Sequence, residues 1–144
     1  MSNTTHISKI EQGRAEFAYK YAIDATKMAK EEDRKKYRAY AKNVPMMIKT
    51  NGLGATIAFI FSRKDKESAY GLLYKQLTDW LSQKQKNPIN LSNDKPLVEA
   101  VVTLNSPAYR AVTAEVLALF SWLRRFAEGL IQDEEDHKKE ESAS

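Results

Sequence analysis

The amino-acid sequence predicts an all-α fold, a compact single-domain bundle of about five to seven helices. Apolar residues recur every three or four positions in successive segments, which is the spacing of one helix face. Strand-like alternation bounded by turn residues does not occur, and the sequence shows no internal repeat. Proline, glycine and asparagine stand between the segments, where a helical bundle needs short joints.

The first segments are helical by pattern. Residues 7–30 place large apolar side chains at helical spacing, and residues 31–42 form a second, strongly charged piece. Proline disfavours helical geometry in the residue before it. We therefore expect this second helix to end or kink at Val44, with Pro45 starting a new turn.

A break at Asn51 or Gly52 is expected to precede an apolar helix, and residues 64–84 carry an amphipathic stripe. Turn-forming residues at 85–96 predict a long loop. The longest helix is expected in residues 105–132, with Asn105 or Ser106 as the N-cap and Pro107 just inside the first turn. The apolar stripes of this helix and of residues 64–84 predict four core or interface positions: Trp80, Phe120, Trp122 and Leu123.

Composition excludes several chemistries. The chain has no cysteine, which removes disulfides, thiolate metal sites and thiol nucleophiles. Its two histidines, His6 and His137, lie near the ends, and its acidic residues outside the C-terminal segment form no catalytic arrangement. We therefore expect no catalytic residue, no metal site and no cofactor.

No apolar tract is long enough to span a bilayer, and the first residues lack the apolar core of a secretory signal. These observations predict a cytoplasmic chain that makes no contact with a membrane.

Charge is distributed unevenly along the chain. Residues 133–144 hold six acidic residues and two lysines, a net charge of −4, whereas residues 1–132 carry 21 basic and 13 acidic residues, a net charge of +8. We expect residues 1–132 to form the helical domain and residues 133–144 to form an acidic, disordered tail. A basic domain favours polyanionic partners, with a solubilising surface as the alternative.

The stretch PMMIKTNGLGATIAF, residues 45–59, combines glycines with a following helix. A phosphate-binding loop of the Walker type needs Gly-Lys-Ser/Thr, and Gly54 is followed by alanine. The glycines are better explained as a helix end with positive φ at Asn51 and Gly52 and close helix packing at Gly54. Lys49 would then stand at an exposed corner, beside free amides at a helix N-terminus that suit a nucleic-acid backbone.

Other basic residues occupy positions that need an explanation. Arg14 lies on the same helix face as apolar residues, where a charge is not expected. Either an ion pair inside the protein or a contact between the Arg14 guanidinium and a phosphate would explain its position. Arg124 and Arg125 are adjacent in an apolar helix, and Glu128 is a partner for only one of them. Lys42 shares a face with other basic residues of its helix, where a solvated face is the alternative.

Three motifs, RAEFAY, VPMMIKTNGLGATIAFI and EVLALFSWLRRFAEGLI, resemble in order and spacing the small α-helical subunit of the type III-B (Cmr) CRISPR effector complex. The resemblance implies a non-catalytic subunit that stacks with copies of itself into a short filament. Its implied partners are other Cmr subunits, crRNA and target RNA, in antiviral defence. The candidate RNA-binding residues that the resemblance implies are Arg14, Lys49, Arg124 and Arg125 within the motifs and Lys42, which stands two residues before the second motif.

The sequence leaves one alternative open, a helical protein–protein adaptor. In that case the basic face would bind acidic surfaces of partner proteins without contacting RNA, and the glycine corner would be purely structural.

Overall fold

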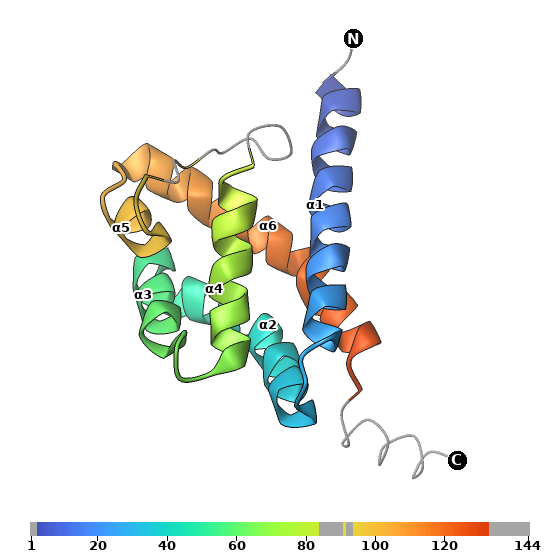
Figure 1. Cartoon of the computed structure of the whole chain (residues 1–144). Helices are drawn as coiled ribbons and strands as arrows, with labels where there is room; N and C mark the ends of the chain where they lie inside the picture. The colour runs from blue at the N-terminus through green and yellow to red at the C-terminus, as the bar shows by residue number, and fades with distance from the viewer. Residues whose placement is uncertain (1–2, 84–90, 92–93, 133–144) are drawn as a thin grey trace.

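The computed structural model of the chain describes residues 3–83, 91 and 94–132, with side chains described from residue 8 onward. Six helices and no strand occur in these ranges (Figure 1), which confirms the predicted all-α bundle. The helices are α1 (Asn3–Thr26), α2 (Glu31–Asn51), α3 (Leu53–Arg63), α4 (Ser68–Leu81), α5 (Leu97–Val102) and α6 (Ser106–Leu130).

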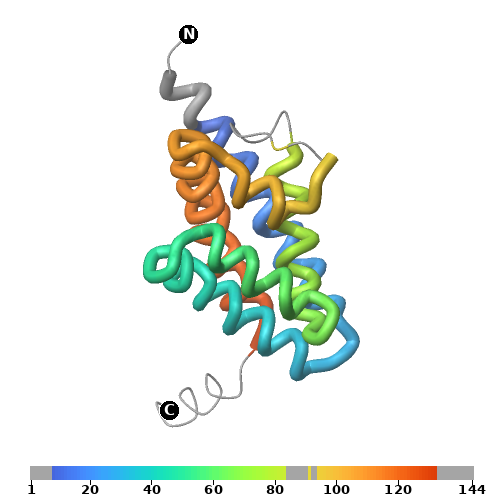
Figure 2. The backbone as a smooth tube through the Cα atoms, turned by 90° about the vertical axis from the view of Figure 1, so that its left-hand side faces the viewer, coloured from blue at the N-terminus to red at the C-terminus, as the bar shows by residue number. Residues whose placement is uncertain are grey.

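The helices pack around α6. Both α1 and α2 lie against α6, and α4 lies in front of it in Figure 1, between α1 and α3. The side view in Figure 2 shows α2 and α3 as neighbouring helices beside α6. Because α2 and α6 are adjacent, residues from the middle and the end of the sequence share one surface.

The core confirms most of the apolar positions expected from sequence. Trp80, Phe120 and Leu123 are almost completely buried, and Trp122 is partly buried against the same cluster. Tyr37 is also fully buried. Burial of such side chains is the main term that stabilises the bundle.

Helix α2 contains Pro45. Of the end or kink expected at Val44, the end does not occur, since α2 continues through Pro45 to Asn51. Proline removes one backbone donor, but Val44 and Ile48 on either side of it are buried in the core. Packing of this apolar face therefore keeps the chain helical where the local rule predicts a break.

The joints and caps agree with the turn chemistry of the sequence. Gly52 separates α2 from α3 with a φ of 90°, which a residue with a side chain rarely adopts. Asn105 caps α6, and its Oδ1 accepts a hydrogen bond of 3.0 Å from the Ala108 amide. Most of the expected loop at 85–96 and the whole of segment 133–144 lie outside the described residues.

Candidate nucleic-acid interface

A hollow of about 260 Å³ opens where the C-terminal half of α2 lies against α6. Its lining consists of Pro45 and Lys49 from α2 and Leu117, Phe120, Ser121, Arg124 and Arg125 from α6. Three of the five candidate RNA-binding residues, Lys49, Arg124 and Arg125, thus meet around one hollow. The sequence did not indicate the other lining residues as RNA contacts, and Phe120 was expected in the core or an interface, where it is buried.

Lys49 lies in the last turn of α2 and is exposed. A cation at this end is stabilised by the partial negative charge of the helix C-terminus. Within the described part of the chain no ion pair engages Lys49 or Arg125. Both side chains can therefore approach an external anion without first breaking an internal ion pair.

Arg124 is more constrained than Arg125. Its Nε lies 3.5 Å from the Glu128 Oε1, one turn along α6, and its side chain remains 52% exposed. An exposed ion pair of this kind is worth less than about 1 kcal/mol. The pair orients Arg124, and about half of its side chain remains accessible to a phosphate.

Lys42 lies outside this hollow but on the same side of α2. It is exposed and precedes Lys49 by seven residues, which places both on one helix face. Lys35 and Arg38 belong to the same helical stripe. The basic face predicted for α2 therefore runs alongside its contact with α6.

Arg14 is held inside the protein by carboxylates. Its Nη2 lies 2.7 Å from Glu115 Oε2 and its Nε lies 3.1 Å from Glu115 Oε1, while Nη1 contacts Glu11. The Arg14 side chain is only 15% exposed, and its hydrogen bonds to the Glu115 carboxylate raise its pKa. Of the two explanations for Arg14, the structure shows the ion pair, and its partner Glu115 lies on another helix. We accordingly leave Arg14 out of the candidate interface.

The glycine corner has a structural role in the fold. The Gly54 amide donates a hydrogen bond of 2.7 Å to the Tyr109 hydroxyl, so this amide at the start of α3 is not available to an anion. The Tyr109 hydroxyl also lies 3.4 Å from the position that a Cβ would occupy at Gly52 or Gly54. The expectation of free helix N-terminal amides beside Lys49 is therefore wrong for Gly54.

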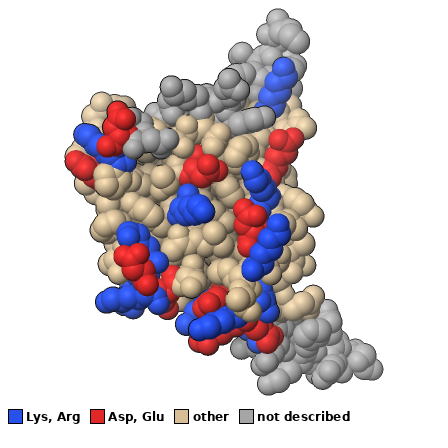
Figure 3. All heavy atoms as spheres, in the orientation of Figure 1, with Lys and Arg blue, Asp and Glu red and all other residues tan. Residues whose placement is uncertain are grey.

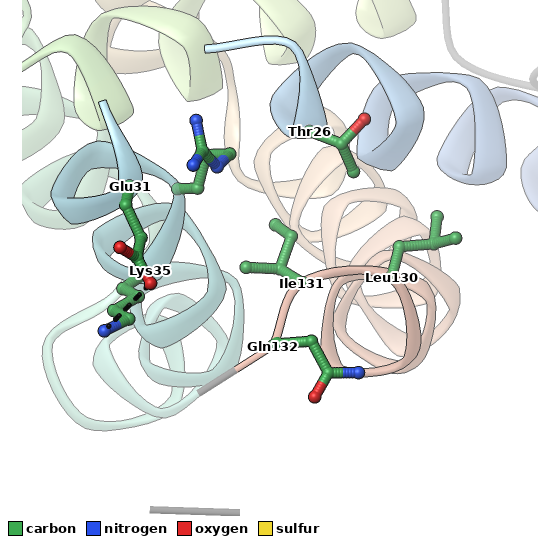
Figure 4. Close-up of a pocket in the computed structure, with 7 residues that line it drawn as sticks. Thr26, Glu31, Lys35, Leu130, Ile131 and Gln132 are labelled. Atoms are coloured by element: carbon green, nitrogen blue, oxygen red, sulfur yellow. Dashed lines mark ion pairs between the residues drawn. The ribbon is translucent and has the colours of Figure 1, made fainter. Parts of the chain in front are cut away.

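A second hollow, also of about 260 Å³, lies where α2 begins and α6 ends (Figure 4). Its lining consists of Thr26, Glu31, Arg34, Lys35, Leu130, Ile131 and Gln132. Lys35 Nζ pairs with Glu31 Oε1 at 3.4 Å beside the opening, and Arg34 donates to the Met28 carbonyl. The helical spacing of Lys35, Arg38 and Lys42 indicated a basic helix face, but the sequence did not indicate the hollow beside Lys35.

The two hollows lie along one line of α2. Glu31, Lys35, Pro45 and Lys49 are separated by four, ten and four residues, so they project within about 80° of one another. We call the strip between the two hollows, with the basic residues Lys35, Arg38, Lys42, Lys49, Arg124 and Arg125, the α2–α6 seam.

Comparison with known proteins places the chain in a family. The sequence model of the CRISPR-associated protein family Cas_Cmr5 matches residues 10–130. The chain belongs to the Cmr5 family. The CRISPR system Cmr subunit Cmr5 of Thermus thermophilus is 33% identical over 119 residues, covering 83% of this chain and 93% of that protein.

The fold agrees with a solved Cmr5 structure. The crystal structure of a CRISPR-associated Cmr5 family protein from Thermus thermophilus superimposes with a TM-score of 0.68 at 29% identity. The similarity covers 85% of this chain and 98% of that one. The resemblance drawn from the three sequence motifs is thereby confirmed, and the Cmr5 match spans every candidate residue of the seam.

The face that carries α4 has mixed charge. Lys and Arg groups lie close to Asp and Glu groups on this face, with other residues between them (Figure 3). Within residues whose side chains are described, no three potential metal ligands come together. None of the described helices is both long and apolar enough to span a bilayer.

Proposed function

We propose that this chain is a non-catalytic small subunit of the type III-B Cmr effector complex and that its α2–α6 seam contacts RNA. The observation that carries the proposal is the convergence of Lys49, Arg124 and Arg125 on one hollow. Membership of the Cmr5 family and the name of the Thermus relative support the assignment to a Cmr complex.

The seam has the chemistry of a phosphate-binding surface. Arginine forks and lysine ammonium groups are the usual partners of backbone phosphates, and these contacts position a nucleic acid without reading its sequence. Recognition would then depend on the shape and charge of crRNA paired with target RNA. The three cations at the hollow are all exposed, which fits contact with the RNA backbone.

The proposal extends to the assembly. Copies of the chain stack into a short filament beside the subunits that carry the crRNA, and together they help form the basic channel for the guide–target duplex. Cleavage belongs to other subunits, and the complex acts in the cytoplasm in antiviral defence. These points rest on the family resemblance, and co-purification with a crRNA-loaded complex tests them.

The test of the seam is the double variant Lys49→Ala/Arg125→Ala in the assembled complex. Each lost phosphate contact is expected to lower the slope of log affinity against log salt by about 0.7–0.9, so the double variant loses about 1.4–1.8. Affinity should fall about equally for all target sequences. The matched control is Lys66→Ala/Lys75→Ala, which removes the same charge from exposed positions outside the seam.

Complex size and helical content are measured for both variants before RNA binding is compared. A seam variant that assembles normally and keeps the salt slope of the parent would contradict the proposal.

One observation favours the adaptor alternative. Met46 is 68% exposed on α2, between Lys42 and Lys49, and a large exposed apolar side chain beside basic groups suits a protein partner. If the seam variant fails to assemble while the isolated chain keeps its fold, the adaptor function gains support over RNA contact.

A further inference from the structure

The end of the described chain lies at the α2–α6 seam. Gln132 is the last described residue, and it lines the second hollow together with Arg34 and Lys35. Figure 4 shows Gln132 on the opposite side of this hollow from Glu31 and Lys35. The last described residue therefore lies beside a hollow that the basic stripe of α2 also lines through Lys35.

This segment has the opposite charge to the seam. Residues 133–144 contain six acidic residues and two lysines, a net charge of −4. The seam carries six basic residues, of which Lys35 pairs with Glu31 and Arg124 pairs with Glu128. Four of the six acids, residues 133–136, come first after Gln132, so the densest negative charge directly follows a residue that lines the hollow.

The segment is long enough to cover the seam. Lys35 and Lys49 are fourteen residues apart on α2, which corresponds to about 21 Å at a rise of 1.5 Å per residue. Twelve residues in extended conformation span up to about 40 Å. The acids can therefore reach the hollow at Lys49 as well as the hollow at Gln132.

We propose that residues 133–144 bind back along the α2–α6 seam and occupy it in competition with RNA. This proposal deepens the function proposed above, on which its RNA component rests. The contact is electrostatic and intramolecular, so the segment acts at an effective concentration in the millimolar range without deep burial. Salt weakens it, because the screening length falls from about 10 Å at 0.1 M to about 3 Å at 1 M.

Occupation of the seam lowers the apparent affinity for competing ligands. If the segment covers the seam about three quarters of the time, RNA binds about fourfold more weakly than to the open seam. A cognate guide–target duplex with many phosphates displaces the segment, whereas a short unspecific RNA does so less readily. The acids thus give the basic surface selectivity that its lysines and arginines lack.

The contact itself is tested without RNA. The chain has no cysteine, so Ser142→Cys provides a single attachment point for a spin label. We expect paramagnetic broadening of the amides of Lys42, Lys49 and Arg124 at low salt, with the amide of Val101 in α5 as the reference. Broadening should disappear at about 1 M salt. Absence of broadening along α2 and α6, or broadening that 1 M salt leaves unchanged, would overturn the proposal.

Competition is tested with two full-length variants of equal charge. In the first, residues 133–136 are neutralised by Asp133→Asn, Glu134→Gln, Glu135→Gln and Asp136→Asn. In the control, four exposed acids outside α2 and α6 are neutralised by Glu16→Gln, Asp24→Asn, Asp65→Asn and Glu99→Gln. We expect the first variant to bind a short unspecific RNA about threefold to fivefold more tightly than the control.

The two proposals fail in different ways. Equal affinities of the two variants, with RNA binding that depends on Lys49 and Arg125, would overturn the competition while leaving the proposed function intact. Salt-sensitive broadening in a protein whose RNA binding does not depend on the seam would refute the proposed function and support the intramolecular contact.

Discussion

Glu115 is 2% exposed in the middle of α6, although a carboxylate is costly to bury. Its Oε1 accepts hydrogen bonds from Trp80 Nε1 at 3.0 Å and from Arg14 Nε at 3.1 Å, and its Oε2 accepts from Arg14 Nη2 at 2.7 Å. One side chain therefore joins α1, α4 and α6. A hydrogen bond from Trp122 to Glu11 extends the network and lowers the pKa of Glu11.

Glu115→Ala should destabilise the protein by about 3–5 kcal/mol, because it removes the carboxylate that accepts from the buried Trp80 indole and from Arg14 Nε and Nη2, so that Arg14 keeps only its contact with Glu11. The control is Glu128→Ala in the same helix, which breaks only the exposed pair with Arg124 and should cost less than about 1 kcal/mol. Urea unfolding of both variants measures the difference. Equal destabilisation would show that the buried network adds nothing beyond a surface ion pair.

At the scale of the element, α2 remains helical through Pro45 although proline disfavours the interior of a helix, because the helix packs in the core on both sides of it. Pro45 cannot donate to the carbonyl one turn before it, yet α2 spans 21 residues without interruption. Buried residues Tyr37, Ala41, Val44 and Ile48 form one face of the helix on both sides of the proline. Proline in this position also lines the hollow with Lys49.

Pro45→Ala should raise the free energy of unfolding by about 1–3 kcal/mol, because it restores a backbone donor and removes the ring from the helix interior. Pro107→Ala is the control, since Pro107 lies in the first turn of α6, where no intrahelical donor is lost. That control should change stability by less than about 1 kcal/mol. A Pro45→Ala variant that unfolds at lower urea than the parent would contradict the account of α2.

At the scale of the whole molecule, tyrosine hydroxyls connect the helices through the interior. Tyr37 donates to Gln76 Oε1 at 2.5 Å, and Gln76 Nε2 donates to the Tyr21 carbonyl at 3.0 Å. Tyr70 stacks on Tyr40 with ring centroids 3.8 Å apart. Burial raises the pKa of Tyr70 to about 12 and also raises the pKa of Tyr21 and Tyr37 above the ordinary value of 10.0.

Stability should therefore fall as the pH rises above about 10. The unfolded chain releases these phenolic protons near pH 10, whereas the folded chain retains them to higher pH, so the stabilisation present below pH 10 is progressively lost. Each tyrosine contributes up to about 1.4 kcal/mol per pH unit in this window. Urea unfolding across the alkaline range, with tyrosinate absorbance recorded in parallel, measures the loss.

Tyr37→Phe provides the comparison for this prediction. The variant is less stable at neutral pH because Gln76 loses a partner, but its stability should decline less steeply above pH 10. A decline as steep as that of the parent would show that Tyr37 is not among the groups responsible.

The sequence by itself determined the helical class, a helix joint at Asn51 or Gly52 and the membership of the Cmr5 family. Each of these depends on short-range information, such as helical spacing, a cap residue or a motif order, that the chain carries locally. It also singled out Lys49, Arg124 and Arg125, because Lys49 precedes a glycine joint and the two arginines are adjacent within an apolar helix.

Only the tertiary structure decided which of these residues act together. Arg14 pairs with Glu115, 101 residues away, and Tyr109 caps Gly54 from another helix, so no local pattern could assign either contact. Pro45 stays helical because α2 packs on α6, and the same packing brings Lys49 to Arg125. Periodicity shows which face of a helix is apolar, but the partner of that face is chosen by packing of the whole bundle.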